Sequence, residues 1–258
     1  MNLVFVAVLF SGGIFLGMLV CLELGRRLGV RQLARDPAGA RQGIGAVEGA
    51  VFGLLGLLIA FTFSGAASRF DDRRHLIRQE ANNIGTAWLR LDLLPPTPRD
   101  NLRDLFRQYL DSRLEAYAKL PDLDAFKAGL ARSGELQSEI WSKAVAACRE
   151  SGSQPAHMLL LPALNDMFDI TTTRSEAMKM HPPKAVFGML GALAFMSSLM
   201  AGYGLAGSKA RSWIHVIGFV GTMAVTTYVI FDMELPRFGF LNVKEADQVL
   251  IDLRESMK

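Results

Sequence analysis

Four long runs without a charged residue dominate the pattern of apolar and polar positions along the chain. They cover Leu3–Leu22, Gly49–Ser68, Ala185–Ser208 and Ser212–Phe231, and each contains at least 20 residues. About 20 residues at a rise of ~1.5 Å span the ~30 Å hydrocarbon core of a bilayer, where a helix satisfies its own backbone hydrogen bonds. A buried helix of a soluble protein is the alternative for any single run, but four such runs in one chain predict four transmembrane helices.

The first run is interpreted as a mature span rather than a secretory signal. No basic leader precedes Leu3, the run is longer than the roughly 7–15 apolar residues of a signal peptide, and no A-x-A cleavage motif ends it. Arg26 and Arg27 follow it as an ordinary exit from the membrane. A loop, Gly25–Gly43, is then expected to join spans one and two, and a tight turn, Ser208–Arg211, to join spans three and four.

The segment between the second and third spans, Arg69–Pro183, has a different character. It contains 16 Lys and Arg and 16 Asp and Glu, so it is strongly polar without a net charge. The second span is expected to continue into it as one helix, because apolar residues recur at spacings of three, four and seven. These residues are Phe70, Ile77, Ala81, Ile84, Trp88 and Leu91. Further helices are predicted after Pro95-Pro96, over Glu135–Cys148 and over Leu164–Met180, which makes the segment a water-facing helical domain.

Composition agrees with a membrane protein and excludes several other classes. Half of the residues are apolar, the mean hydropathy is +0.24 and only 21% of the residues are charged, against roughly 25% in soluble domains. A disordered chain would need low hydrophobicity and a high net charge. The net charge of +3 is too small to indicate nucleic-acid binding. Two cysteines, Cys21 and Cys148, are too few for a disulfide scaffold or a cysteine-rich zinc module.

The predicted fold is therefore an all-α integral membrane protein, with four transmembrane helices and a helical water-facing domain inserted between spans two and three. The expected division is 1–68 for spans one and two with an arginine-rich loop, 69–183 for the helical domain, 184–235 for spans three and four, and 236–258 for a C-terminal tail. The side of the membrane that holds the domain stays open. Lys and Arg near the membrane number seven on the loop side and eight on the domain side, a tie for the positive-inside rule.

The second span holds the most informative residues. Gly45, Gly49 and Gly53 repeat every four residues, and this small-xxx-small spacing lets helices approach closely in lipid, so helix packing is favoured for them. Glu48 lies near the mouth of the span, where a carboxylate is costly and is by default a candidate functional group. The alternatives for Glu48 are snorkelling to the interface and pairing with an arginine such as Arg41.

Several separated blocks of sequence resemble the bestrophin-like domain family of prokaryotes and plants. In and beyond the second span they are Gly45–Ala50, Gly53–Leu58, Phe61–Ala66, Arg69-Phe70-Asp71 and Glu80–Ala87. The later blocks are Leu91–Pro95, Leu164–Asp169 with Arg174, His181-Pro182-Pro183 and Pro236–Phe240. The resemblance covers nearly the whole chain.

The resemblance implies a homo-oligomer, which is a pentamer in bestrophins, with a large helical cytosolic domain between spans two and three. In bestrophins the second span lines an anion pore and forms a neck of apolar and aromatic side chains, which is the kind of constriction that gates by dewetting. The corresponding pore-lining candidates here are Phe52, Gly56, Ile59 and Phe63, with ordinary helix packing as the alternative. The tail departs from the usual acidic-arginine-proline pattern, and no acidic cluster resembles the calcium clasp of the animal channels.

Three arginines follow the second span. In an oligomer, Arg69, Arg73 and Arg74 would ring a vestibule and concentrate anions, and together with Glu48 they are the candidates for the pore mouth and vestibule. Anchoring to phospholipid headgroups is the alternative for the arginines. A ring of Glu48 would favour cations instead, so charge selectivity stays open. Asp71 and His75 have the spacing of a two-ligand metal pair, but a solvated pair is favoured and no metal site is predicted.

No sequence motif supports an enzyme. The chain lacks H-E-x-x-H, a G-x-x-x-x-G-K-[ST] phosphate loop and a G-x-S-x-G elbow, so neither catalysis nor a cofactor is predicted. The leading hypothesis is an oligomeric channel-like protein of the bacterial inner membrane that passes anions such as chloride. Its partners are the lipid bilayer, other copies of the chain and the permeant ion. The alternative is a non-conducting membrane scaffold or signalling partner whose helical domain binds another protein.

Overall fold

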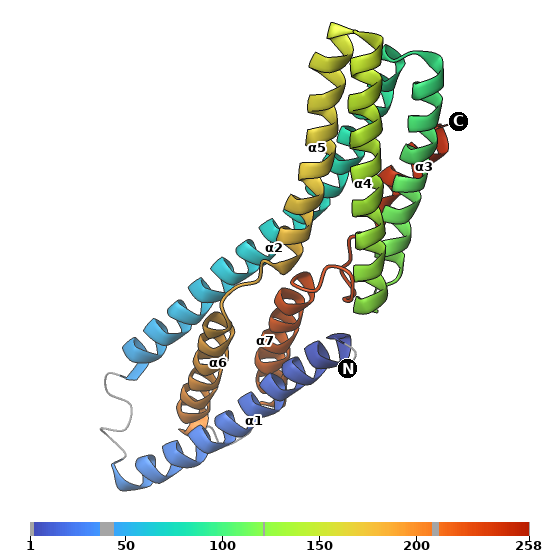
Figure 1. The fold of residues 1–258 in the computed structure, drawn as a ribbon. Coiled ribbons are helices and arrows are strands. Elements are labelled where there is room, and N and C mark those ends of the chain that lie inside the picture. Colours follow the sequence, from blue (N-terminus) through green and yellow to red (C-terminus); the bar gives the residue numbers. More distant parts are fainter. Residues whose placement is uncertain (1–2, 37–43, 121, 208–211, 258) are drawn as a thin grey trace. The chain divides into compact units, whose positions relative to one another are not determined.

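The computed structural model describes residues 3–36, 44–120, 122–207 and 212–257, and helices make up nearly all of them (Figure 1). No strand occurs within these ranges. The chain forms two compact units, which are described separately below. The first contains Met1–Ser68 and His181–Leu241, and the second contains Arg69–Met180 and Asn242–Lys258.

Four helices carry the predicted membrane spans, which confirms the all-helical, four-span prediction. They are α1 (Leu3–Arg35), α2 (Ile44–Arg90), α6 (Lys184–Gly204) and α7 (Trp213–Met233). Within the described ranges, four helical segments are long and apolar enough to cross a bilayer. The predicted turn Ser208–Arg211 lies outside the described residues.

Helix α1 differs from the prediction at its C-terminal end. A loop was expected from Gly25, but the helix continues to Arg35. The reason is that Gly25 and Gly29 are packing residues of a helix and not loop residues, because both are buried against α6.

Helices α1 and α6 pack with their backbones in close contact. A Cβ atom added to Gly25 would overlap the carbonyl oxygen of Leu199, and one added to Gly202 would overlap the carbonyl oxygen of Leu22. One added to Gly17 would lie 2.7 Å from the Phe195 ring. Small residues permit such an approach, which is how helices gain packing energy in lipid without a hydrophobic driving force.

Helix α7 completes the core of the first unit. Its buried side chains Val216, Val220 and Met223 pack with buried residues of α1 and α6, and Leu55 of α2 joins the same cluster. At the end of α7 the buried Asp232 carboxylate accepts hydrogen bonds from the backbone N–H groups of Phe240 (3.0 Å) and Leu241 (2.7 Å). This carboxylate therefore fixes the turn that follows the fourth span.

The second unit is built mainly from four helices. They are the second half of α2, α3 (Pro96–Ala118), α4 (Leu123–Ser151) and α5 (Gln154–Lys179). The prediction that the second span continues beyond Ser68 as one helix is thus confirmed. A short 3₁₀ turn, η1 (Leu91–Leu93), follows α2. The apolar stripe expected on α2 lies in the core, where Ile77, Ile84 and Leu91 are at most 1% exposed.

Local signals place the ends of these helices. The Asp122 carboxylate accepts from the N–H groups of Asp124 and Ala125, which caps the start of α4. Gly152 closes α4 in the left-handed region (φ 61°), where a side chain would be strained. Ser153 then caps α5. Both helices begin well before the predicted residues, and α5 also contains Pro162, which removes a single backbone donor.

The C-terminal residues contribute to the second unit. The 3₁₀ turn η3 (Lys244–Asp247) leads into α8 (Gln248–Ser256), and Leu250 and Met257 are buried in the core of this unit. Of the residues after Pro236, those up to Leu241 belong to the first unit and those from Asn242 onward to the second.

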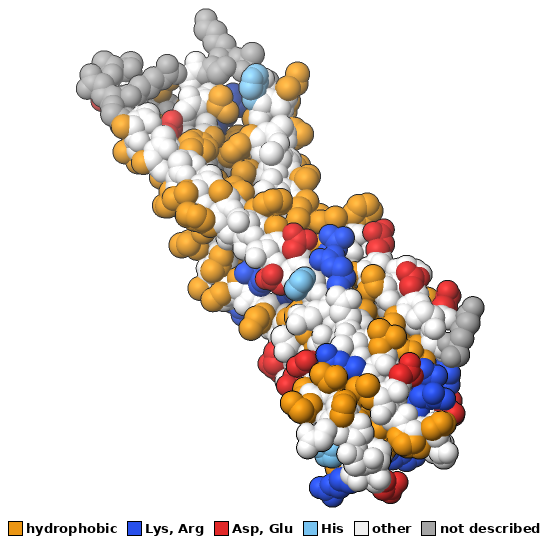
Figure 2. All heavy atoms as spheres, turned by 90° about the horizontal axis from the view of Figure 1, so that it is seen from above, with side chains coloured by type: hydrophobic (Ala, Val, Ile, Leu, Met, Phe, Trp, Pro, Cys, Tyr) orange, Lys and Arg blue, Asp and Glu red, His pale blue; other side chains and the backbone are white. Residues whose placement is uncertain are grey.

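The two units have different surfaces. Figure 2 shows one part of the surface dominated by hydrophobic side chains and another part covered with charged ones. On the four span helices the exposed large apolar residues include Leu54, Leu57, Phe61, Ile214 and Val225. Exposed apolar side chains of this number are expected where a helix faces lipid or another copy of the chain.

Candidate functional site

The first half of α2 has one packed face and one open face. On the packed face Leu55 is 3% exposed, and the Phe52 ring lies edge-on to Phe219 of α7 with centroids 5.9 Å apart. Leu58 and Ile59 are half-buried against the same core. This face attaches α2 to α7.

The open face of α2 carries the glycines. Gly45, Gly49, Gly53 and Gly56 are all exposed, and a Cβ atom added to any of them would meet no described atom within 4 Å. Within the described part of one chain, no helix therefore packs against the small-xxx-small stripe. Lipid, water or another copy of the chain must cover it.

The four pore-lining candidates do not share one environment. Gly56 and Phe63 are exposed, and 41% of Phe63 is accessible. Phe52 and Ile59 are half-buried and contact the core that includes α7. The predicted face is thus split between the open side of α2 and its boundary with α7.

Glu48 lies at the start of α2 and beside the end of α6. Its Oε1 atom would be 3.3 Å from a Cβ atom added to Gly204, and this oxygen is buried without a hydrogen-bond partner among the described residues. The proposed partner Arg41 lies outside those residues. The carboxylate is therefore held against α6 rather than extended into open space.

The three arginines after the span have different surroundings. Arg73 is 4% exposed and donates hydrogen bonds to the carbonyl oxygens of Ala177 (3.2 Å) and Met180 (2.7 Å), at the end of α5. Arg74 is half-exposed and lies 3.6 Å from the Asp71 carboxylate. Arg69 is half-buried. Arg73 thus satisfies the last carbonyls of a helix, as basic side chains commonly do.

The described residues bring no third ligand to Asp71 and His75. Among the described residues there is no group of three or more His, Cys, Asp or Glu side chains that could hold an ion. Asp71 pairs with Arg74, and both Asp71 and His75 are exposed.

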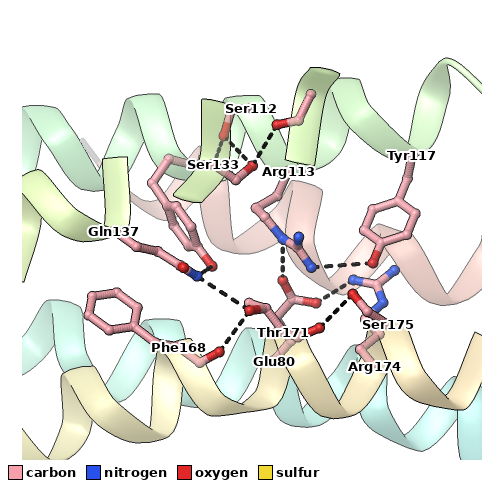
Figure 3. Close-up of polar contacts among 12 residues, drawn as sticks. Glu80, Ser112, Arg113, Tyr117, Ser133, Gln137, Phe168, Thr171, Arg174 and Ser175 are labelled. Atoms are coloured by element: carbon pink, nitrogen blue, oxygen red, sulfur yellow. Dashed lines mark hydrogen bonds and ion pairs between the residues drawn. The ribbon is translucent and has the colours of Figure 1, made fainter. Parts of the chain in front are cut away.

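A buried ion cluster joins three helices of the second unit (Figure 3). Glu80 of α2 is fully buried; its Oε1 accepts from Arg113 Nε of α3 at 2.7 Å, and its Oε2 accepts from Arg174 Nη1 of α5. Arg174 also donates to Asp247 of η3 at 3.2 Å, and its guanidinium lies 3.9 Å from the centre of the Tyr117 ring. The cluster therefore connects α2, α3, α5 and the C-terminal segment.

The charges in this cluster are matched. Burial by itself would raise the pKa of Glu80, but the Arg174 and Arg113 guanidiniums outweigh that effect and hold the pKa below its ordinary value. Burial raises the pKa of the neighbouring Tyr109 phenol, so that it stays neutral. Glu80 and Asp247 balance Arg113 and Arg174, and this largely buried set is stable only when complete, because removal of one member leaves an uncompensated charge.

Comparison with known proteins identifies the family. The model of the bestrophin-like domain matches residues 6–247. The chain belongs to the bestrophin-like domain family. No curated protein matches its sequence.

Solved structures share the bestrophin-like fold. A point variant of a bacterial bestrophin homologue from Klebsiella pneumoniae has a TM-score of 0.62 at 16% identity, over 92% of this chain and 99% of that one. A second variant of that homologue has a TM-score of 0.63 at 15% identity, over 94% and 99%. A variant described only as a membrane protein has a TM-score of 0.64 at 15% identity, over 94% and 99%. The family resemblance noted in the sequence is thus confirmed, and the fold is that of these proteins.

The ion cluster of this bestrophin-like chain was not predicted, although the sequence carries a signal for it. Glu80 lies three residues after Ile77 and four before Ile84, so it occupies the apolar stripe of α2. Arg113 and Arg174 likewise follow buried residues by four positions, Tyr109 in one case and Ile170 in the other. Charged residues on the apolar faces of three helices predict a buried ion cluster.

Proposed function

We propose that this bestrophin-like protein is an oligomeric channel of the bacterial inner membrane that passes anions through a pore lined by its second span. The observation that carries the proposal is the open face of α2. A stripe of glycines with no neighbour among the described residues offers lipid little apolar contact but lets a second helix backbone approach closely. Copies of the chain assembled around α2 would cover this face, and the bestrophin relationship implies a pentamer.

The pore wall would come from the open side of α2. Gly56 and Phe63 would face the pathway, while Phe52 and Ile59 would hold the helix against α7. A ring of Phe63 side chains would form an apolar constriction, which blocks ions by excluding water until it widens. Flow would be passive and down the gradient.

Charge at the two ends of the span would set selectivity. Arg69 and Arg74 are candidates for a positive vestibule, whereas Arg73 is used to cap α5. Glu48, held against α6, would contribute less negative charge to the mouth than an extended carboxylate. This arrangement favours anions. The second unit, with its charged surface, would be the water-facing domain inserted between spans two and three.

A non-conducting scaffold is the second candidate function. Its support is a set of exposed apolar residues in the second unit, where Leu89 and Met158 are each 70% exposed. Arg90 donates to the carbonyl oxygen of Leu159 at 2.7 Å, which brings the end of α2 to the start of α5 in this area. A scaffold would use such a surface to bind another protein.

Ion flux from liposomes tests the proposal. Purified protein is reconstituted, and chloride and potassium release are compared for the natural sequence, Phe63→Ala and Phe61→Ala. Both phenylalanines are exposed on α2, but Phe61 lies on the far side of the helix from the pore candidates. We expect chloride flux to rise in Phe63→Ala only, because trimming the neck eases its hydration.

The same flux experiment distinguishes a channel from a non-conducting scaffold. Absence of flux in all three proteins, with a native oligomer shown by mass, would contradict the channel and favour the scaffold. Potassium flux without chloride flux would show a pore that selects cations instead of anions.

A further inference from the structure

A polar cleft in the second unit lies beside the buried ion cluster. It has a volume of about 220 Å³ and is formed by helices α3, α4 and α5. Its lining includes Arg113, Ser133, Gly134, Gln137, Thr171 and Ser175. None of these residues belongs to a membrane span or to the pore candidates.

Arg113 gives this cleft a guanidinium edge with an unused donor. Its side chain is 2% exposed, with Nε donating to Glu80 and Nη2 donating to the Tyr117 hydroxyl at 3.3 Å. The remaining nitrogen, Nη1, has no partner among the described residues, and Arg113 is the single charged residue of the lining. Figure 3 shows the guanidinium between α3 and α5, with Thr171 and Ser175 nearby. A buried guanidinium edge is well suited to a carboxylate.

The opposite wall offers hydrogen-bond acceptors. The Thr171 hydroxyl donates to the Phe168 carbonyl at 2.7 Å, and the Ser175 hydroxyl donates to the Thr171 carbonyl at 2.8 Å. The Gln137 amide N–H₂ is shared between the Tyr109 and Thr171 hydroxyls. Since the protons of these groups are already used, the hydroxyl oxygens and the Gln137 carbonyl oxygen present lone pairs to the cleft. They suit a ligand that carries N–H or O–H donors.

We propose that this cleft binds a small carboxylate that also carries hydrogen-bond donors, the chemistry of an amino acid or a hydroxy acid. The carboxylate would meet Arg113, and the amino or hydroxyl group would meet the oxygens of Gln137, Thr171 and Ser175. A volume of about 220 Å³ corresponds to roughly seven water molecules at ~30 Å³ each, so a ligand of about that number of non-hydrogen atoms would fill the cleft. Binding in this cleft does not require that the span helices conduct ions.

Binding of defined probes to the full-length protein in detergent tests this site. Glycine and L-lactate are the probes. The control compounds are acetate, which lacks the donor group, glycinamide, which lacks the carboxylate, and chloride, which is a simple anion. Calorimetry measures binding and tryptophan fluorescence follows the melting temperature. We expect glycine or L-lactate to bind and raise the melting temperature, and the other three to bind at least about tenfold more weakly, because each lacks at least one of the two groups that the cleft would bind.

Two variants fill the cleft without touching the ion cluster. Gly134→Leu adds a side chain where a Cβ atom meets nothing within 4 Å, and Ser175→Leu removes a hydroxyl that bonds only within its own helix. The matched controls are Ser142→Leu on α4 and Thr173→Leu on α5, whose exposed hydroxyls also bond within their helices. Both filling variants should weaken probe binding by roughly tenfold or more, and both controls should leave it unchanged.

Three results would overturn the proposal. They are failure of both glycine and L-lactate to bind, equal binding of acetate or chloride, and binding that survives both filling variants. Because the two variants lie on different helices, misfolding of one would leave the other as a test.

Discussion

Different interactions stabilise the inside of each of the two units of this bestrophin-like protein. In the first, α1 and α6 meet through their backbones at Gly25 and Gly202. In the second, an apolar core surrounds Glu80 and its two arginines. The difference follows from the solvent, because lipid supplies no hydrophobic driving force between helices whereas water does. Close contact of backbones is therefore critical in one unit and completeness of a buried charge set in the other.

The largest effect is expected from the charge set. Glu80→Gln leaves the buried Arg113 without a counterion and Arg174 with Asp247 alone, and we expect it to reduce the free energy of unfolding by about 3–5 kcal/mol. Denaturant unfolding in detergent, followed by the fluorescence of Trp88 and Trp141 in the second unit, measures this loss. Glu115→Gln, an exposed position on α3, is the control and should cost less than ~0.5 kcal/mol. A loss below ~1 kcal/mol for Glu80→Gln would show that the cluster does not stabilise the unit.

The next effect contrasts a packed glycine with an open one. Gly25→Val should destabilise the first unit by about 1–3 kcal/mol or more, because its side chain would overlap the backbone of Leu199. Gly53→Val should leave the stability of a single chain within ~0.5 kcal/mol, because nothing described lies near it.

The two glycine variants also differ in what else they should change. Gly53→Val is expected to weaken the oligomer, which native mass spectrometry would detect as smaller species, if copies pack along α2. Melting temperature and oligomer mass are measured for both variants. Equal melting temperatures for Gly25→Val and the natural sequence would contradict the difference between the packed and the open glycine.

A smaller effect should appear on acidification. Because the pKa of Glu80 is lower in the folded state than in the unfolded chain, its ionised form contributes stability above the ordinary glutamate pKa of ~4.3. That contribution is lost as the pH falls from this value through the lower folded pKa. The melting temperature of the natural protein should therefore fall more steeply below about pH 4.3 than that of Glu80→Gln. Parallel pH profiles for the two proteins would contradict this assignment.

The smallest effect is expected at the surface of the second unit. Arg254 of α8 donates to both carboxylate oxygens of Asp111, at 2.7 and 2.9 Å, but the two side chains are 33% and 46% exposed. Solvent screens such a pair, so Asp111→Asn should cost no more than about 1 kcal/mol. A double-mutant cycle with Arg254→Gln measures the coupling energy. A coupling above ~2 kcal/mol would mean that α8 is attached through this pair rather than through Leu250 and Met257.

Sequence patterns predicted some elements well and others poorly. The uncharged runs located all four span helices, and the stripe through Ile77 and Ile84 correctly extended α2 beyond the membrane. The starts of α4 and α5 were placed too late, since Gly129 and Gly134 weaken the helical signal in the first half of α4 and Pro162 resembles a helix boundary in α5. The assignments of individual residues to pore, mouth and vestibule stay predictions.

The sequence by itself determined the helical class, the four spans and the family, because these depend on length, hydropathy and local motifs that need no partner. Tertiary structure alone decided which glycines are packed and which charges are paired. Gly25 and Gly53 look alike along the chain, yet one meets a backbone and the other meets no described atom. Glu80 and Arg113 are 33 residues apart and come within 2.7 Å only when α2 and α3 pack. Such contacts depend on how helices distant in sequence are brought together, and local periodicity carries no information about that.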